Sequence, residues 1–183
     1  MQKVRIIFNT KANNIQERIR LLFGKYVSVS IIINNKKYSI TPKDGVQVEP
    51  YINKSLSLDE IVCFDKHYDI IIPNAFVYSK AERFLKRQEN KKFDYFGATL
   101  GQTLGLGFQS ENKWFDSELI TKYLQYCLFD EVMDFNASKI SINKLEKIVS
   151  DIATSQKDKK DAVIERTNIS KKIQDFKSKL NNN

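Results

Sequence analysis

The chain is poor in cysteine and histidine, with two Cys and one His among its 183 residues. Two cysteines cannot form a disulfide framework, which is typical of a chain that folds in a reducing compartment. A structural zinc site needs four Cys or His ligands, so these three residues cannot complete one by themselves. We therefore predict neither a metal nor another cofactor.

Long apolar runs are also missing. No stretch approaches the roughly 20 residues that a membrane-spanning helix requires. The short apolar run within residues 1–8 is too short for a signal peptide and indicates a β-strand instead. We expect no membrane span and no signal peptide.

Apolar residues make up 42% of the chain and aromatic residues 11%, and the net charge is +8. A chain of this length and composition can bury a core and fits one domain with an extension. Apolar spacing predicts the individual strands and helices, and their order suits an α+β domain in which helices pack on an antiparallel sheet. The expected strands are residues 4–8, 26–33, 36–41, 46–51 and 67–73, and the expected helices are residues 15–23, 79–89 and 117–129.

Two of these predictions depend on local signals. Asn34-Asn35 between two apolar runs indicates a β-hairpin turn. Ser79 followed by Glu82 matches a capping box, which predicts that a helix begins there, with Phe84 and Leu85 facing inward.

Residues 114–119 read Trp-Phe-Asp-Ser-Glu-Leu. This motif resembles the Trp-aromatic-Cys-Ser-Glu-Leu motif of circularly permuted papain-like (NlpC-type) cysteine hydrolases, with Asp116 at the position of the cysteine. Three further landmarks occur in the family's order. Residues 19–29 match the segment that carries the catalytic histidine and place Ser28 at its position. Residues 42–45 match a Pro-x-Asp-Gly turn, and residues 93–97 match a Tyr-Asp-Tyr-aliphatic-Gly element. The resemblance covers roughly residues 1–130 and implies a papain-like fold.

Both catalytic positions of the resembled family are replaced. A cysteine hydrolase needs a thiolate activated by an imidazole, whereas Asp116 is a poor acyl acceptor and the Ser28 hydroxyl does not titrate near neutral pH. A Ser28–Asp116 pair with the aspartate as base is conceivable, but serine activated without His or Lys is rare. We therefore predict no enzymatic activity. We expect Asp116 to be the N-cap of the helix at 117–129 and to face Ser28 across a shallow pocket.

Cys63, Cys127 and His67 are the other catalytic candidates. Cys63 and His67 are four residues apart, which allows a Cys/His dyad, although triad members need not be neighbours in sequence. The alternative is a buried cysteine and a surface histidine. Cys127 falls on the apolar face of the helix at 117–129, where we expect a buried, inert thiol.

The C-terminal part differs from the rest, and we expect a linker at residues 131–141 and an amphipathic helical arm at residues 142–183. Apolar residues at helical spacing predict two partner-binding stripes: Ile142, Leu145, Ile148, Val149 and Ile152, and then Ile169, Ile173, Phe176 and Leu180. Residues 156–183 hold eight Lys or Arg and four Asp or Glu. This balance permits nucleic-acid binding, but charge runs are usually solvated faces, so we favour a protein partner.

We therefore expect a non-catalytic structural module derived from a cysteine hydrolase. Permuted papain-like domains of this length occur in bacteriophages, so the resemblance implies a multi-copy virion protein at the head–tail junction or tail, made in the host cytoplasm. One alternative is an active hydrolase or acyltransferase that acts on peptidoglycan or lipid. A second alternative is a nucleic-acid-binding accessory protein.

Overall fold

The structure, a computed structural model, describes residues 2–12, 18, 24–51, 66–95, 97–98 and 112–181. For residues 168, 169 and 171–181 it describes the backbone alone. The helix expected at residues 15–23 falls almost wholly outside the described residues.

A five-stranded antiparallel sheet forms the centre of the domain, in the order β4-β3-β2-β1-β5. All five strands expected from the sequence are present, with boundaries shifted by at most two residues, and the α+β class is confirmed. The strands are β1 (Gln2–Asn9), β2 (Ser28–Ile33), β3 (Lys36–Thr41), β4 (Gly45–Pro50) and β5 (Lys66–Ile72).

The predicted hairpin turn joins β2 to β3. Asn34 and Asn35 have φ angles of 49° and 58°. Two consecutive residues in the left-handed region match the twist of the flanking strands, and asparagine tolerates that region better than most residues. The turn therefore fixes the register in which Ile33 lies opposite Lys36.

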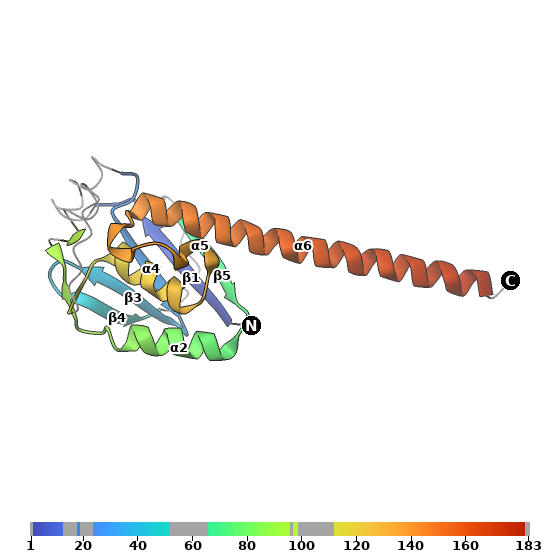
Figure 1. Ribbon diagram of the computed structural model, residues 1–183, viewed down its shortest axis with the longest axis horizontal. Coiled ribbons are helices and arrows are strands. Elements are labelled where there is room, and N and C mark those ends of the chain that lie inside the picture. Colours follow the sequence, from blue (N-terminus) through green and yellow to red (C-terminus); the bar gives the residue numbers. More distant parts are fainter. Residues whose placement is uncertain are drawn as a thin grey trace.

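Helices cover one face of this sheet (Figure 1). Alternate strand residues such as Ile6, Ile31 and Ile70 are fully buried, as expected for a sheet with one face on the core. The helical elements are α2 (Ala75–Lys86), α4 (Asp116–Tyr126), α5 (Asp130–Met133), the short 3-10 helix η2 (Ala137–Lys139) and α6 (Ile142–Asn181). Two short strands, β6 (Lys92–Phe93) and β7 (Lys113–Trp114), pair in parallel beside the main sheet.

The capping-box prediction at Ser79 was wrong, because α2 begins four residues earlier. Asn74 is the N-cap, and its side chain accepts hydrogen bonds from the N–H groups of Phe76 and Val77. Ser79 lies inside the helix, and Glu82 pairs with Lys86 at 2.9 Å. β5 ends at Ile72, and only Pro73 lies between this strand and the N-cap Asn74. α2 therefore begins almost directly after β5.

The segment 131–141 is part of the folded domain, so the prediction of a linker was wrong. It contains most of α5 and all of η2, and it buries Val132, Ala137 and Ile140. The Ser117 hydroxyl on α4 donates a hydrogen bond to the Ile140 carbonyl at 2.7 Å, which ties the segment to the core. Val132, Ala137 and Ile140 do not form an apolar run in the sequence, and they are buried because α5 and η2 pack against α4.

The first stripe of the predicted arm is also part of this core. Leu145, Val149 and Ile152 are fully buried, and Ile142 and Ile148 nearly so, in one cluster with the side chains of the sheet. The same part of α6 is fixed to β5 by polar contacts. Glu146 pairs with Lys66 at 2.7 Å and accepts a hydrogen bond from the Tyr68 hydroxyl. The domain therefore extends into α6.

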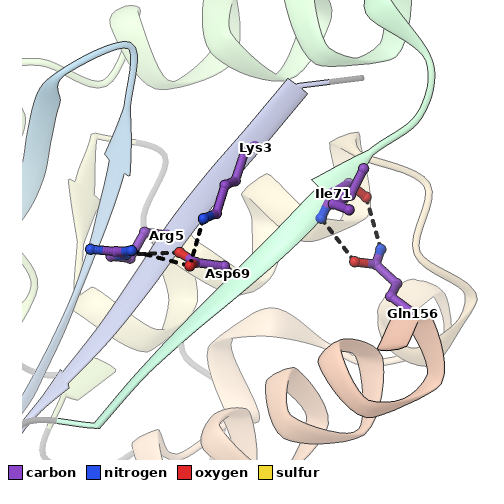
Figure 2. A network of polar contacts seen from close by, with 5 residues as sticks. All are labelled: Lys3, Arg5, Asp69, Ile71 and Gln156. Atoms are coloured by element: carbon purple, nitrogen blue, oxygen red, sulfur yellow. Dashed lines mark hydrogen bonds and ion pairs between the residues drawn. The ribbon is translucent and has the colours of Figure 1, made fainter. Parts of the chain in front are cut away.

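Polar contacts also hold the edge of the sheet (Figure 2). Arg5 and Lys3 on β1 pair with Asp69 on β5 at 2.7 and 2.8 Å. The hydrogen bond from Arg5 lowers the pKa of the Asp69 carboxyl group to about 2. On the other side of β5, the Gln156 side chain of α6 bonds to the backbone of Ile71.

Candidate functional site

The start of α4 is positioned by the pair of short strands. The Asp94 N–H, just after β6, donates to the Trp114 carbonyl of β7 at 2.8 Å. Phe115 follows in an extended conformation, is the N-cap of α4 and is fully buried. Asp94 and Asp116 are thus brought to the same end of the helix.

Asp116 lies in the interior of the domain, at 1% exposure. One carboxylate oxygen accepts a hydrogen bond from the Val29 N–H at 3.2 Å, and the other accepts one from the Ser117 N–H at 3.1 Å. The pairing of β2 with β3 ends at Ile31 opposite Tyr38. The Asp116 carboxylate therefore bonds to the backbone of β2 at Val29, two residues before the paired part of β2 and β3.

The N-cap prediction for Asp116 was wrong, because Phe115 is the N-cap and Asp116 is the first residue of α4. Its carboxylate instead joins the helix to β2. A negative charge in the first turn still lies at the favourable end of the helix dipole. Burial of the carboxylate also means that it does not line an open pocket.

Ser28 is the first residue of β2 and directly precedes Val29, so the structure brings it to the same end of the sheet as Asp116. Its hydroxyl accepts a hydrogen bond from the Asn9 side-chain amide at 2.8 Å, across the strand pair in which the two residues are opposite each other. The Ser28 hydroxyl thus joins β1 to β2.

Glu118 is a member of the site that sequence reasoning did not single out. It is fully buried, and neither carboxylate oxygen has a hydrogen-bond partner among the residues that the structure describes. Burial, reinforced by the negative charge of Asp94, raises the pKa of its carboxyl group to about 8. Glu118 is therefore mostly protonated at neutral pH. The signal in the sequence was its place two residues after Asp116, in the motif that begins α4.

Asp94 is also buried and accepts a hydrogen bond from the Gly97 N–H at 2.9 Å. A Cβ at Gly97 would lie 2.8 Å from the Asp94 carboxylate and 3.0 Å from the Phe115 ring, so a glycine is needed there. Among the described residues, no three His, Cys, Asp or Glu side chains are grouped so that they could hold a metal ion.

Of the other catalytic candidates, Cys127 is buried and His67 is exposed. Cys127 is buried at the end of α4, as predicted, and burial raises the pKa of its thiol to about 12. His67 lies exposed on β5. Cys63 falls outside the described residues, so the expectation of a buried cysteine in place of a Cys63–His67 dyad stays a prediction.

The predicted partner-binding residues fall into two groups. Ile142, Leu145, Ile148 and Ile152 are buried in the core, so the prediction that they bind a partner was wrong. Spacing alone cannot distinguish a stripe that packs on its own sheet from one that packs on another chain. Ile169, Ile173, Phe176 and Leu180 lie on the helical backbone of α6, and their side chains are outside the description.

The second half of α6 leaves the domain and projects away from it (Figure 1). Every side chain from Lys157 to Thr167 is exposed, and the helix continues to Asn181. We call residues 157–181 the projecting arm. At 1.5 Å per residue it is about 37 Å long.

Comparison of the chain with protein-family models, with curated proteins and with solved structures found no match. Within the described part of the chain, no helix has both the length and the apolar composition that crossing a bilayer requires.

Proposed function

We propose that this chain is a non-catalytic assembly module, in which a folded domain supports a projecting arm that packs against another protein. The observation that carries this proposal is the exposure of the arm. A single helix without tertiary contacts is marginal in water, because most helical stability in proteins comes from packing. A 25-residue arm therefore gains much of its stability from a partner.

Apolar residues continue along the arm. Val163 and Ile164 are 61% and 48% exposed. Beyond them, the sequence places Ile169, Ile173, Phe176 and Leu180 at alternating spacings of four and three, which is the pattern of a coiled-coil seam. Such a seam is stabilised when a second helix covers it.

The environment of Asp116 supports a non-catalytic role. The residue occupies the position of the nucleophile in the resembled family, yet its carboxylate is buried and bonds to the backbone of Val29. A nucleophile must reach its substrate, and a buried carboxylate that holds a helix to a strand is a structural group.

The kind of assembly follows from the resemblance alone. Permuted papain-like domains of this length occur in bacteriophages, and we propose on that basis that the chain is a virion component at the head–tail junction or tail. The partner of the arm is then a neighbouring virion protein.

The test compares three variants for incorporation into the particles of the parent virus. Truncation after Gln156 removes the arm and retains the docked half of α6. Ile169→Ser, Ile173→Ser and Phe176→Ser together remove apolar side chains from an intact arm. Lys171→Gln, Lys172→Gln and Lys177→Gln together are the matched control, because they remove charge only.

We expect the truncation and the serine variant to abolish incorporation, and the glutamine variant to reduce it only slightly. Circular dichroism of the purified variants checks that the domain stays folded. If the lysine changes are more damaging and assembly falls steeply with salt, the arm binds nucleic acid and the proposal is wrong.

A further inference from the structure

A groove lies between α2 and the C-terminal end of α4, on a part of the domain that α6 does not form. It has a volume of about 430 Å³. This is within the size range of pockets that hold small ligands or a few side chains of a peptide. The groove is lined by Lys80, Phe84, Trp114, Lys122, Gln125, Tyr126 and Leu128.

Leu128 is in an unfavourable backbone conformation. Its φ angle is 60°, in the left-handed region. The Leu128 N–H donates to the Gln125 carbonyl at 3.0 Å, and the Phe129 N–H donates to the Leu124 carbonyl at 3.3 Å. These two bonds end α4 in a Schellman motif, in which the position of Leu128 is usually glycine.

The Leu128 side chain is also 60% exposed, so burial in the core does not offset the unfavourable conformation. Glycine would close the same motif without steric cost. A strained residue with a large exposed apolar side chain points to a role outside the fold.

The floor of the groove is aromatic. Phe84 and Tyr126 are stacked with their ring centres 4.4 Å apart, and Phe84 meets Trp114 edge to face at 5.9 Å. The Trp114 N–H donates to Gln88 at 3.0 Å, which fixes its ring. Tyr126 remains 38% exposed, so an apolar surface that the fold holds rigidly adjoins Leu128.

The ionisable side chains among the lining residues are Lys80 and Lys122, both basic. Lys80 is exposed, Lys122 is half-buried, and the Lys91 ammonium lies 5.9 Å from the centre of the Trp114 ring. No Asp or Glu is among the described residues that line the groove. A ligand with carboxylates is therefore favoured. The projecting arm of a second copy is disfavoured, because its own charge is predominantly basic.

We propose that this groove binds an acidic amphipathic segment of a partner protein. An apolar side chain of the segment packs on Leu128 and Tyr126, and its carboxylates pair with Lys80 and Lys122. A single-stranded nucleic acid fits less well. Phe84 and Tyr126 stack on each other, and the most exposed apolar group of the groove is aliphatic, so the groove is not a stacking platform for bases.

The test uses the full chain and a fluorescein-labelled 12-residue peptide of Leu, Phe and Glu, with binding measured by fluorescence anisotropy. Two control peptides replace every Glu with Gln, or every Leu and Phe with Ser. A 12-nucleotide single-stranded oligonucleotide serves as a non-peptide polyanion. We expect saturable binding of the acidic apolar peptide, and binding at least about tenfold weaker for both control peptides and the oligonucleotide.

Variants locate the binding surface. Leu128→Gly removes the apolar contact and relieves the backbone, so we expect about tenfold weaker binding together with a higher unfolding temperature. Lys122→Gln weakens binding and reduces its salt dependence. Lys43→Gln, which changes an exposed lysine in the β3–β4 turn, leaves binding unchanged. Equal binding of all peptides, stronger binding of the oligonucleotide, or full binding by Leu128→Gly would each overturn the proposal.

Discussion

The side chain of Gln156 on α6 pairs with the backbone of Ile71 on β5 through two hydrogen bonds, each 2.8 Å long (Figure 2). The Ile71 N–H donates to the amide oxygen, and the amide nitrogen donates to the Ile71 carbonyl. β5 is the last strand in the order of the sheet, so its outer edge presents backbone groups that no described strand occupies. The primary amide of Gln156 bonds to them as a neighbouring strand would.

This contact also marks where α6 leaves the domain. The side chains that precede Gln156 include the buried stripe, whereas those from Lys157 to Thr167 are all exposed. Edge strands are sites of unwanted pairing between chains, and proteins commonly cover them. The end of the docked half of α6 therefore protects the sheet edge.

Replacement of Gln156 by alanine removes both bonds. We expect a loss of about 1–2 kcal/mol in the free energy of unfolding, because each exposed hydrogen bond contributes a modest net amount. Amide hydrogen exchange at Ile71 should accelerate. Lys157→Ala, one residue further along α6, is the control and should leave the exchange at Ile71 unchanged. Equal exchange rates in both variants would show that the contact does not protect the edge.

The docked half of α6 should be essential for folding. Leu145 is fully buried, and Leu145→Ala should reduce the free energy of unfolding by about 3 kcal/mol. Ile164→Ala, on the projecting arm, should change it by less than about 0.5 kcal/mol. Urea denaturation measures both effects.

Truncation makes the same comparison on a larger scale. A chain that ends at Gln156 should fold, and a chain that ends at Ser141 should not, because it loses five buried aliphatic side chains worth roughly 1.5–3 kcal/mol each. A cooperative unfolding transition in the shorter chain would contradict the assignment of this half of α6 to the core.

Glu118 should make stability depend on pH. The pKa of its carboxyl group is raised to about 8 in the folded state, from about 4.3 in an unfolded chain. Between these values the folded state holds a proton that the unfolded state has lost. The contribution of Glu118 to stability therefore falls as pH rises, by up to about 1.4 kcal/mol per pH unit.

Glu118→Gln removes this titration. The free energy of unfolding of the variant relative to the native chain should therefore rise from pH 5 to pH 8, measured by urea denaturation at each pH. Glu165→Gln changes an exposed glutamate on the arm and should show no such trend. Parallel pH profiles for the native chain and Glu118→Gln would mean that Glu118 ionises normally.

The purified chain should hydrolyse neither peptidoglycan stem peptides nor lipid esters. Iodoacetamide should not modify Cys127 in the folded chain at pH 8, because burial keeps its thiol protonated and covered. Mass spectrometry of native and urea-unfolded protein measures this difference. Turnover that disappears in Cys63→Ala or His67→Ala would identify the Cys63–His67 dyad as catalytic.

Local patterns in the sequence determined most of the sheet. Short apolar runs mark β1 and β5, and the asparagine pair marks the hairpin, because strand propensity and turn geometry act over a few residues. The same holds for the burial of Cys127 on the apolar face of α4. The start of α2 could not be chosen in this way, because Asn74 and Ser79 are both acceptable caps and the end of β5 decides between them.

The tertiary structure alone decided which apolar stripe belongs to the core. Leu145 and Ile152 have the same helical spacing as Ile173 and Leu180. Leu145 and Ile152 belong to the core because the fold places β5 against that part of α6. It also decided the environment of Asp116 and Glu118. Asp116 bonds to Val29, which lies 87 residues away in the sequence, and Glu118 is desolvated by the side chains packed around it. No local sequence pattern encodes either environment.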